Sequence, residues 1–165
     1  MRKQEEERIH QIIEERDAQE EPTVLAFKLV EKIETGLHAA VCYVLQEAYG
    51  ETEKEWWVKG VPLNIRSSCA VKREEGSHME EAHHYTNIVD LKSIIECKCN
   101  RKLFNERFQI LQKEKITSKD FLSDLVRFND IRNRVAHPIR TISNDDVLFL
   151  QDYYDAIQLF IRHGI

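Results

Sequence analysis

The chain has 165 residues, a length that fits one domain with a short appendage; 42% of them are hydrophobic and 32% are charged. This composition excludes a disordered chain, and no stretch approaches the roughly 20 apolar residues of a membrane span. Only five Gly and three Pro occur, against about 11 and 8 at average usage, which argues against turn-rich β-sandwiches and barrels.

The net charge of −5 is unevenly distributed along the chain. Residues 1–21 hold four basic and eight acidic side chains, so this segment alone contributes −4 and the rest only −1. Residues 127–140 carry a local positive charge, because they contain four arginines and a single acid, Asp130. The N-terminus lacks a signal-peptide core, so we expect the cytoplasm, where the four cysteines would be reduced.

The first half of the chain predicts two helical segments of different character. Residues 2–21 read as a charged helix with a narrow apolar stripe, either a partner-docking arm or a solvated helix. We therefore expect an acidic N-terminal arm over 1–21 and one domain over 22–165. Pro22 fits the first turn of the next helix, and apolar residues recurring every three or four positions over 23–49 predict a long core helix.

The rest of the chain also has helical periodicity, with no alternation typical of strands. Further helices are predicted over 62–75, 85–99, 103–111, 118–136 and 144–163, with a polar loop over 76–84. Thr117 or Ser118 would cap one of them, and Ser143 with Asp146 resembles a capping box. We expect an all-α bundle of about five to seven helices.

The segment 129–138 combines a motif, a local positive charge and a helix end. It contains Arg132, Asn133 and, five positions after the arginine, His137 before Pro138. Here the chain resembles the HEPN superfamily, whose helical domains carry an Arg, four to six further residues and a His, often with a polar residue after the Arg. The form Arg-Asn-x-Val-Ala-His-Pro is common in that superfamily.

Other parts of the chain resemble the Swt-type branch of HEPN domains, and the likeness covers roughly residues 25–163. The matching residues are Glu34-x-x-Leu37, Tyr49-Gly50, Trp56-Trp57, Gly60-Val61-Pro62, Ile65-Arg66, Tyr85, Asp90-Leu91 and Ile94-Ile95. The sequence departs from the branch at His38, where an Arg is usual, and at residues 97–101, where an Asn-Trp pair is expected.

Spacing alone does not identify the pair, since Arg73 and His78 match it too, in a polar stretch broken by Gly76. On an ideal helix Arg132 and His137 would lie about 140° apart. Pro138 disfavours the helical conformation for His137, so we expect the helix to unwind there and the histidine to swing back toward the arginine.

The resemblance implies a homodimeric endoribonuclease that needs no metal and no cofactor. The ribose 2′-OH would attack the adjacent phosphate, with His137 as acid and base, Arg132 stabilising the phosphate charge and Asn133 assisting. Arg127, Arg134 and Arg140 are predicted phosphate contacts, or else a solvated helix face. By analogy, the setting would be a toxin or phage-defence effector with an antitoxin or regulatory protein as partner, away from membranes.

Two other functions remain open at this point. One is a catalytically inactive HEPN module for dimerisation or for RNA or nucleotide binding, which a buried ion pair between Arg132 and an acid such as Asp130 would favour. The other is a zinc-binding domain built on Cys and His residues of 69–99. The Trp56-Trp57 pair is expected to form a packing corner, with base stacking as the alternative.

Overall fold

A computed structural model describes residues 20–76, 80–137 and 140–162. Within these ranges the chain forms seven α-helices and one 3-10 helix, η1, and no strand, which confirms the predicted all-α class. In chain order they are α2 (Glu20–Tyr49), α3 (Glu53–Gly60), α4 (Leu63–Glu75), η1 (Ala82–Tyr85), α5 (Ile88–Glu96), α6 (Asn105–Lys113), α7 (Ser118–Val135) and α8 (Asn144–Ile161). The predicted N-terminal arm lies outside the described residues, except that Glu20 and Glu21 already belong to α2.

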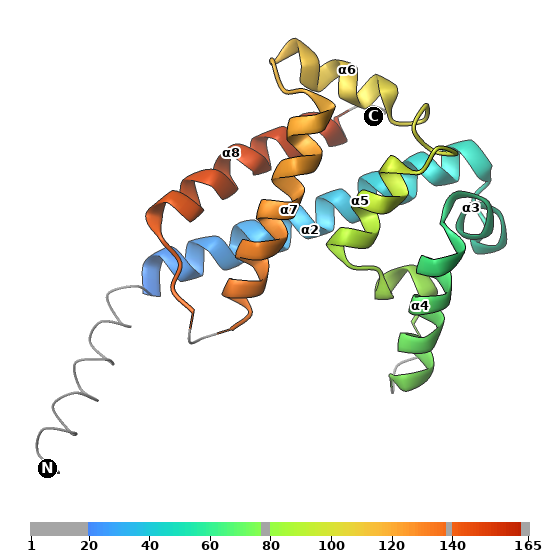
Figure 1. Cartoon of the computed structure of the whole chain (residues 1–165), viewed down its shortest axis with the longest axis horizontal. Helices are drawn as coiled ribbons and strands as arrows, with labels where there is room; N and C mark the ends of the chain where they lie inside the picture. The colour runs from blue at the N-terminus through green and yellow to red at the C-terminus, as the bar shows by residue number, and fades with distance from the viewer. Residues whose placement is uncertain (1–19, 77–79, 138–139, 163–165) are drawn as a thin grey trace, which may run out of the picture.

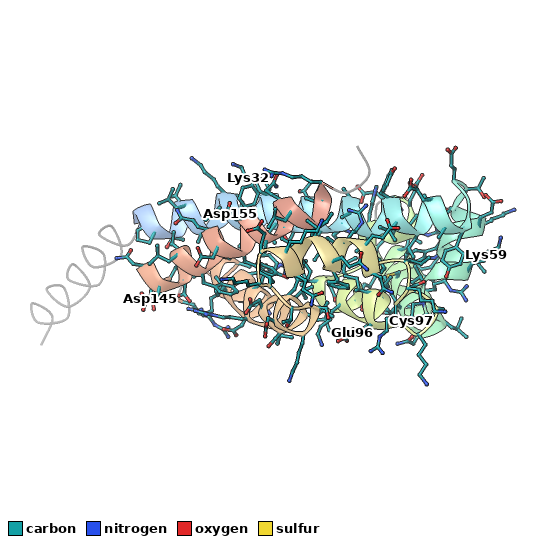
Figure 2. The ribbon with its side chains drawn as sticks, turned by 90° about the horizontal axis from the view of Figure 1, so that it is seen from above. Lys32, Lys59, Glu96, Cys97, Asp145 and Asp155 are labelled. Carbon is teal, nitrogen blue, oxygen red and sulfur yellow. The ribbon has the colours of Figure 1, made fainter. Side chains whose placement is uncertain are left out.

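The long helix α2 runs through the whole length of the molecule (Figure 1). Helices α7 and α8 lie toward its N-terminal end, and α3 and α4 lie toward its C-terminal end. Seen from above, α8 lies alongside α2 (Figure 2). Gly36 allows this approach, because a Cβ atom there would lie only 2.7 Å from Cδ1 of Ile161. The helix ends as predicted at Gly50, which adopts a φ of +113° that other residues rarely tolerate.

Stacked aromatic rings hold α6, α7 and α8 together. The fully buried rings of Phe121 on α7 and Phe160 on α8 lie 4.9 Å apart between centroids, and Phe104 stacks on Phe160 at 6.1 Å. Each such side chain contributes on the order of 2–3 kcal/mol through burial. The same packing fixes the position of α7, which carries the predicted catalytic residues.

The structure corrects the boundaries of several predicted elements. The helix predicted over 85–99 covers only Ile88–Glu96, because Asn87 and Asp90 form a reciprocal capping box at its start. The predicted polar loop includes part of η1, and residues 53–60 form a helix that the sequence pattern did not predict. Trp56 and Trp57 are buried, which confirms the packing corner.

Asn100, in the turn after α5, has a fully buried side-chain amide. The Asn100 side chain donates to the carbonyl oxygens of Gly60 (2.7 Å) and Ile94 (2.8 Å) and accepts from the Tyr49 hydroxyl (3.1 Å). These three bonds connect the ends of α2 and α3 to α5. Because buried polar groups are costly when unpaired, this amide fixes how the three elements meet.

None of the described helices is both long and apolar enough to cross a membrane.

Candidate active site

The loop that carries His137 begins where α7 unwinds. The helix ends at Val135, and the His137 N–H bonds to the Arg134 carbonyl at 3.1 Å instead of continuing the helical pattern. The His137 carbonyl accepts from the Arg140 N–H at 2.9 Å, so the chain turns tightly here. The unwinding before Pro138 is confirmed, and His137 is exposed.

Arg132, in the last turn of α7, is held by a residue from the distant helix α2. Its Nε donates to Glu34 Oε1 at 3.0 Å, and its Nη1 lies 3.4 Å from Oδ1 of the adjacent Asn133. The structure therefore brings Arg132 and Asn133 together, as predicted, and adds Glu34. A carboxylate bonded at Nε fixes the plane of the guanidinium group while leaving its outer edge available.

The Arg132–Glu34 pair is not a buried ion pair. The Arg132 side chain is 42% exposed and the Glu34 side chain 30%, so a phosphate can reach the guanidinium from solvent. Asp130, which we gave as one example of an acid whose buried pairing with Arg132 would favour an inactive module, lies 3.4 Å from Arg134 instead. This arrangement allows Arg132 to bind an anion in a fixed orientation, although the negative charge of Glu34 partly offsets the positive charge of the guanidinium group.

The structure does not join His137 to the other two residues. Within the described ranges, its imidazole makes no hydrogen bond or ion pair, whereas Arg132 bonds to Glu34 and Asn133. The proximity expected for the Arg132–His137 pair therefore stays a prediction.

Both flanks of the His137 loop are anchored by Arg134. Its Nη1 and Nη2 donate to the two carboxylate oxygens of Asp146 at 2.8 and 2.7 Å, and Nη1 also reaches the Thr141 carbonyl at 3.3 Å. Asp146 in turn accepts from the N–H and hydroxyl of Ser143, both at 2.9 Å. These contacts lower the pKa of Asp146 to about 2, with the Arg134 bonds as the largest cause. Arg134 therefore holds the loop, and it could bind RNA only by giving up these bonds to Asp146 and Thr141. Its predicted role as an RNA ligand stays a prediction.

Arg127 and Arg140 lie on either side of this loop and are exposed. The Arg127 guanidinium lies over the ring of Phe149 on α8, 4.1 Å from its centroid. Stacking of this kind leaves the N–H groups in the guanidinium plane directed outward, where they can donate to phosphate. RNA contact by both residues stays a prediction.

His38 is a further polar residue beside Glu34 that residue patterns did not assign to the site. It lies one helical turn after Glu34 on α2, and its Nδ1 lies 3.4 Å from the Thr86 hydroxyl. Burial lowers its pKa from the ordinary value, and His83 and His84 lower it further, whereas Glu34 and Thr86 act in the opposite direction. Two sequence signals point to this position: the four-residue spacing from Glu34, and the resemblance to the Swt-type branch, in which an Arg usually stands at His38.

The cysteines and histidines considered for zinc do not converge. All four cysteines are free thiols, and Cys69 is buried in the core. Among the described residues, no group of three or more His, Cys, Asp or Glu side chains is arranged to hold a metal ion. His78 lies outside the described residues.

Comparisons with known proteins do not add to this geometry. No family model, curated protein or solved structure matches the chain. The function of this chain is therefore inferred from its residues and their arrangement.

Proposed function

We propose that this protein is a metal-independent endoribonuclease of the HEPN type. One observation carries the proposal: Arg132 is oriented by Glu34 yet open to solvent, beside Asn133 and at the helix end from which the His137 loop departs. The motif and its resemblance to HEPN domains supply the reaction. The partly exposed arginine supplies a group that can bind phosphate.

The proposed reaction conserves all atoms of the RNA and needs no cofactor. The ribose O2′ forms a bond to the adjacent phosphorus while the bond from phosphorus to the 5′-oxygen of the next nucleotide breaks. His137 takes the proton of the 2′-OH as base and, as acid, gives that proton to the leaving 5′-oxygen, which yields a 2′,3′-cyclic phosphate and a 5′-OH end. Arg132 stabilises the negative charge that grows on the phosphate oxygens, and Asn133 orients the phosphate or the imidazole.

The HEPN resemblance also implies a homodimer in which the motifs of two chains face each other, and the proposal includes this dimer. Such an arrangement would place a second His137 near each substrate phosphate. A cytoplasmic toxin or phage-defence effector, controlled by an antitoxin or regulatory protein, is the proposed setting by analogy with the family.

The deciding experiment uses purified full-length protein in EDTA with structured and unstructured RNA and a DNA copy of each. Wild type is compared with Arg132→Ala/His137→Ala and with Arg73→Ala/His78→Ala, a control pair of the same spacing. We expect cyclic-phosphate fragments from RNA alone, produced by wild type and the control but not by the first double variant. Cleavage that survives in that variant, or that also occurs on DNA, would overturn the proposal.

A second candidate is a catalytically inactive HEPN module for dimerisation or for RNA or nucleotide binding. The observation that favours it is the Arg132–Glu34 ion pair together with the absence, in the described part of the chain, of any bond between the His137 imidazole and Arg132. Intact RNA with wild-type protein, together with a dimer in analytical ultracentrifugation, would favour this function over catalysis.

A further inference from the structure

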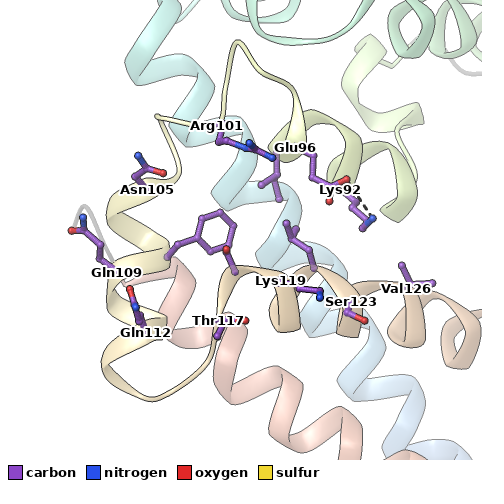
Figure 3. A pocket seen from close by; sticks show the side chains of 14 residues that line it. Lys92, Glu96, Arg101, Asn105, Gln109, Gln112, Thr117, Lys119, Ser123 and Val126 are labelled. Carbon is purple, nitrogen blue, oxygen red and sulfur yellow. Dashed lines mark ion pairs between the residues drawn. The ribbon is translucent and has the colours of Figure 1, made fainter.

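A cleft of about 790 Å³ lies between α5, α6 and the first half of α7, at a distance from the candidate active site (Figure 3). Side chains that can bind a nucleotide line it on several sides. Amide groups come from Asn105, Gln109 and Gln112 on α6, and hydroxyl groups come from the start of α7.

The cleft is positively charged although the chain is acidic overall. Three cations and one acid line it, and the acid, Glu96, already pairs with Lys92 at 3.3 Å. The other two cations, Arg101 and Lys119, enter from opposite sides in Figure 3 and have no hydrogen-bond or ion-pair partner among the described residues. Unpaired cations across a cleft attract an anion such as phosphate.

Apolar side chains form a second part of the cleft lining. Phe108 packs against the core rings of Phe121 and Phe160, at centroid distances of 6.0 and 5.6 Å, and also borders the cleft. Leu122 and Val126 extend this apolar surface along α7. An aromatic ring held by the core, with amides nearby, is the combination on which a base can stack and form hydrogen bonds with its edges.

The cleft and Asn133 lie along the same side of α7, whereas Arg132 lies about 140° around the helix from Lys119. Lys119 and Asn133 are 14 residues apart, which on an α-helix corresponds to about 40° of rotation and about 21 Å of length. Stacked nucleotides advance by about 3.4 Å along one strand of a duplex, so this length corresponds to roughly six stacked nucleotides and to fewer in an extended single strand. One strand bound in the cleft could therefore reach Asn133, at the edge of the candidate active site.

We propose that this cleft binds a nucleotide of single-stranded RNA several positions away from the bond that is cut. Its phosphate is held by Arg101 and Lys119, and its base lies against Phe108 and the α6 amides. This inference rests on the proposed ribonuclease function. A free nucleotide offers the same base and phosphate, so the test separates the two sources.

The test measures binding of the protein to uncleavable 2′-O-methyl RNA of 2 and 16 nucleotides, and to AMP, by fluorescence anisotropy and competition. Arg101→Ala/Lys119→Ala is compared with Lys113→Ala/Lys115→Ala, which removes the same charge from exposed residues outside the cleft. We expect the cleft variant to bind the 16-mer about tenfold more weakly than the control, with a salt slope reduced by about 1.4. The 2-mer, which cannot reach both sites, should bind wild type much more weakly than the 16-mer does.

The outcomes separate this inference from the proposed catalysis. If wild type cuts no RNA but the cleft variant binds the 16-mer more weakly than the control does, the cleft binds RNA and the proposed nuclease activity is wrong. Equal 16-mer affinity in the cleft and control variants, or no binding of the 16-mer by wild type, would overturn the proposal that the cleft binds RNA. Loss of AMP binding in the cleft variant with unchanged 16-mer binding assigns the cleft to a free nucleotide and overturns the RNA assignment.

Discussion

The ion pair between Arg134 and Asp146 should make the stability of this protein depend on pH in a specific window. The folded state holds the pKa of Asp146 at about 2, against an ordinary value of 3.8. Since one pKa unit corresponds to about 1.4 kcal/mol, the charged carboxylate contributes at most about 2.5 kcal/mol. The Arg134 side chain is 26% exposed, and solvent screening reduces the expected contribution to about 1–2 kcal/mol.

The sign of the effect follows from the lowered pKa. The unfolded chain binds a proton at Asp146 more readily than the folded one, so the contribution is complete above about pH 5 and decreases as the pH falls toward 2. About half of it should be gone at pH 3. Asp146→Asn should therefore lower the free energy of unfolding by about 1–2 kcal/mol at pH 7 and by about half as much at pH 3.

Urea denaturation followed by circular dichroism at several pH values measures this difference. Asp145→Asn is the matched control, because Asp145 is an exposed acid in the same first turn of α8 and should contribute at most about 0.5 kcal/mol. A loss in Asp146→Asn no larger than that of the control at pH 7, or a loss that stays the same from pH 7 to pH 3, would refute the reasoning.

Two further substitutions test the buried amide and the active-site pair. Asn100→Asp keeps the side-chain shape but removes both donated bonds, and it should cost about 2–4 kcal/mol at pH 7 in urea denaturation. The penalty should shrink near pH 4, where a protonated carboxyl can donate again; a penalty that grows on acidification would contradict this account. Glu34→Ala removes the acceptor that orients Arg132 and should slow RNA cleavage about 10–100-fold, whereas Glu31→Ala, an exposed acid on α2, should cleave at the wild-type rate. Equal initial rates for the two alanine variants would show that Glu34 does not position Arg132.

Local signals in the sequence predicted most of the helices. The apolar spacing over 23–49 and the Ser143–Asp146 capping box both correspond to observed features. Helix α3 was not predicted, because its eight residues span barely two turns, too few to show a period. Helix α5 begins at Ile88, later than the apolar pattern predicted, because the capping box of Asn87 and Asp90 sets its first residue.

The candidate site was predictable only where its residues are close in sequence. Arg132, Asn133 and His137 belong to one short motif, whereas Glu34 lies 98 positions from Arg132 and meets it through the packing of α2 against α7. The commitment of Arg134 to Asp146 could not be predicted either, because a run of arginines looks the same whether it faces solvent or holds a loop. Tertiary packing decides whether such an arginine faces solvent or holds a loop, and a local sequence pattern does not show that packing.

The 98-residue separation of Glu34 and Arg132 also has a consequence during protein synthesis. At about 5–20 residues per second, roughly 5–20 s pass between translation of the acid and translation of the arginine. Throughout that interval α2 exists without the helix that completes the pair. A ribosome-bound fragment of this chain therefore lacks the oriented arginine, and the site can first assemble when most of the polypeptide has been made.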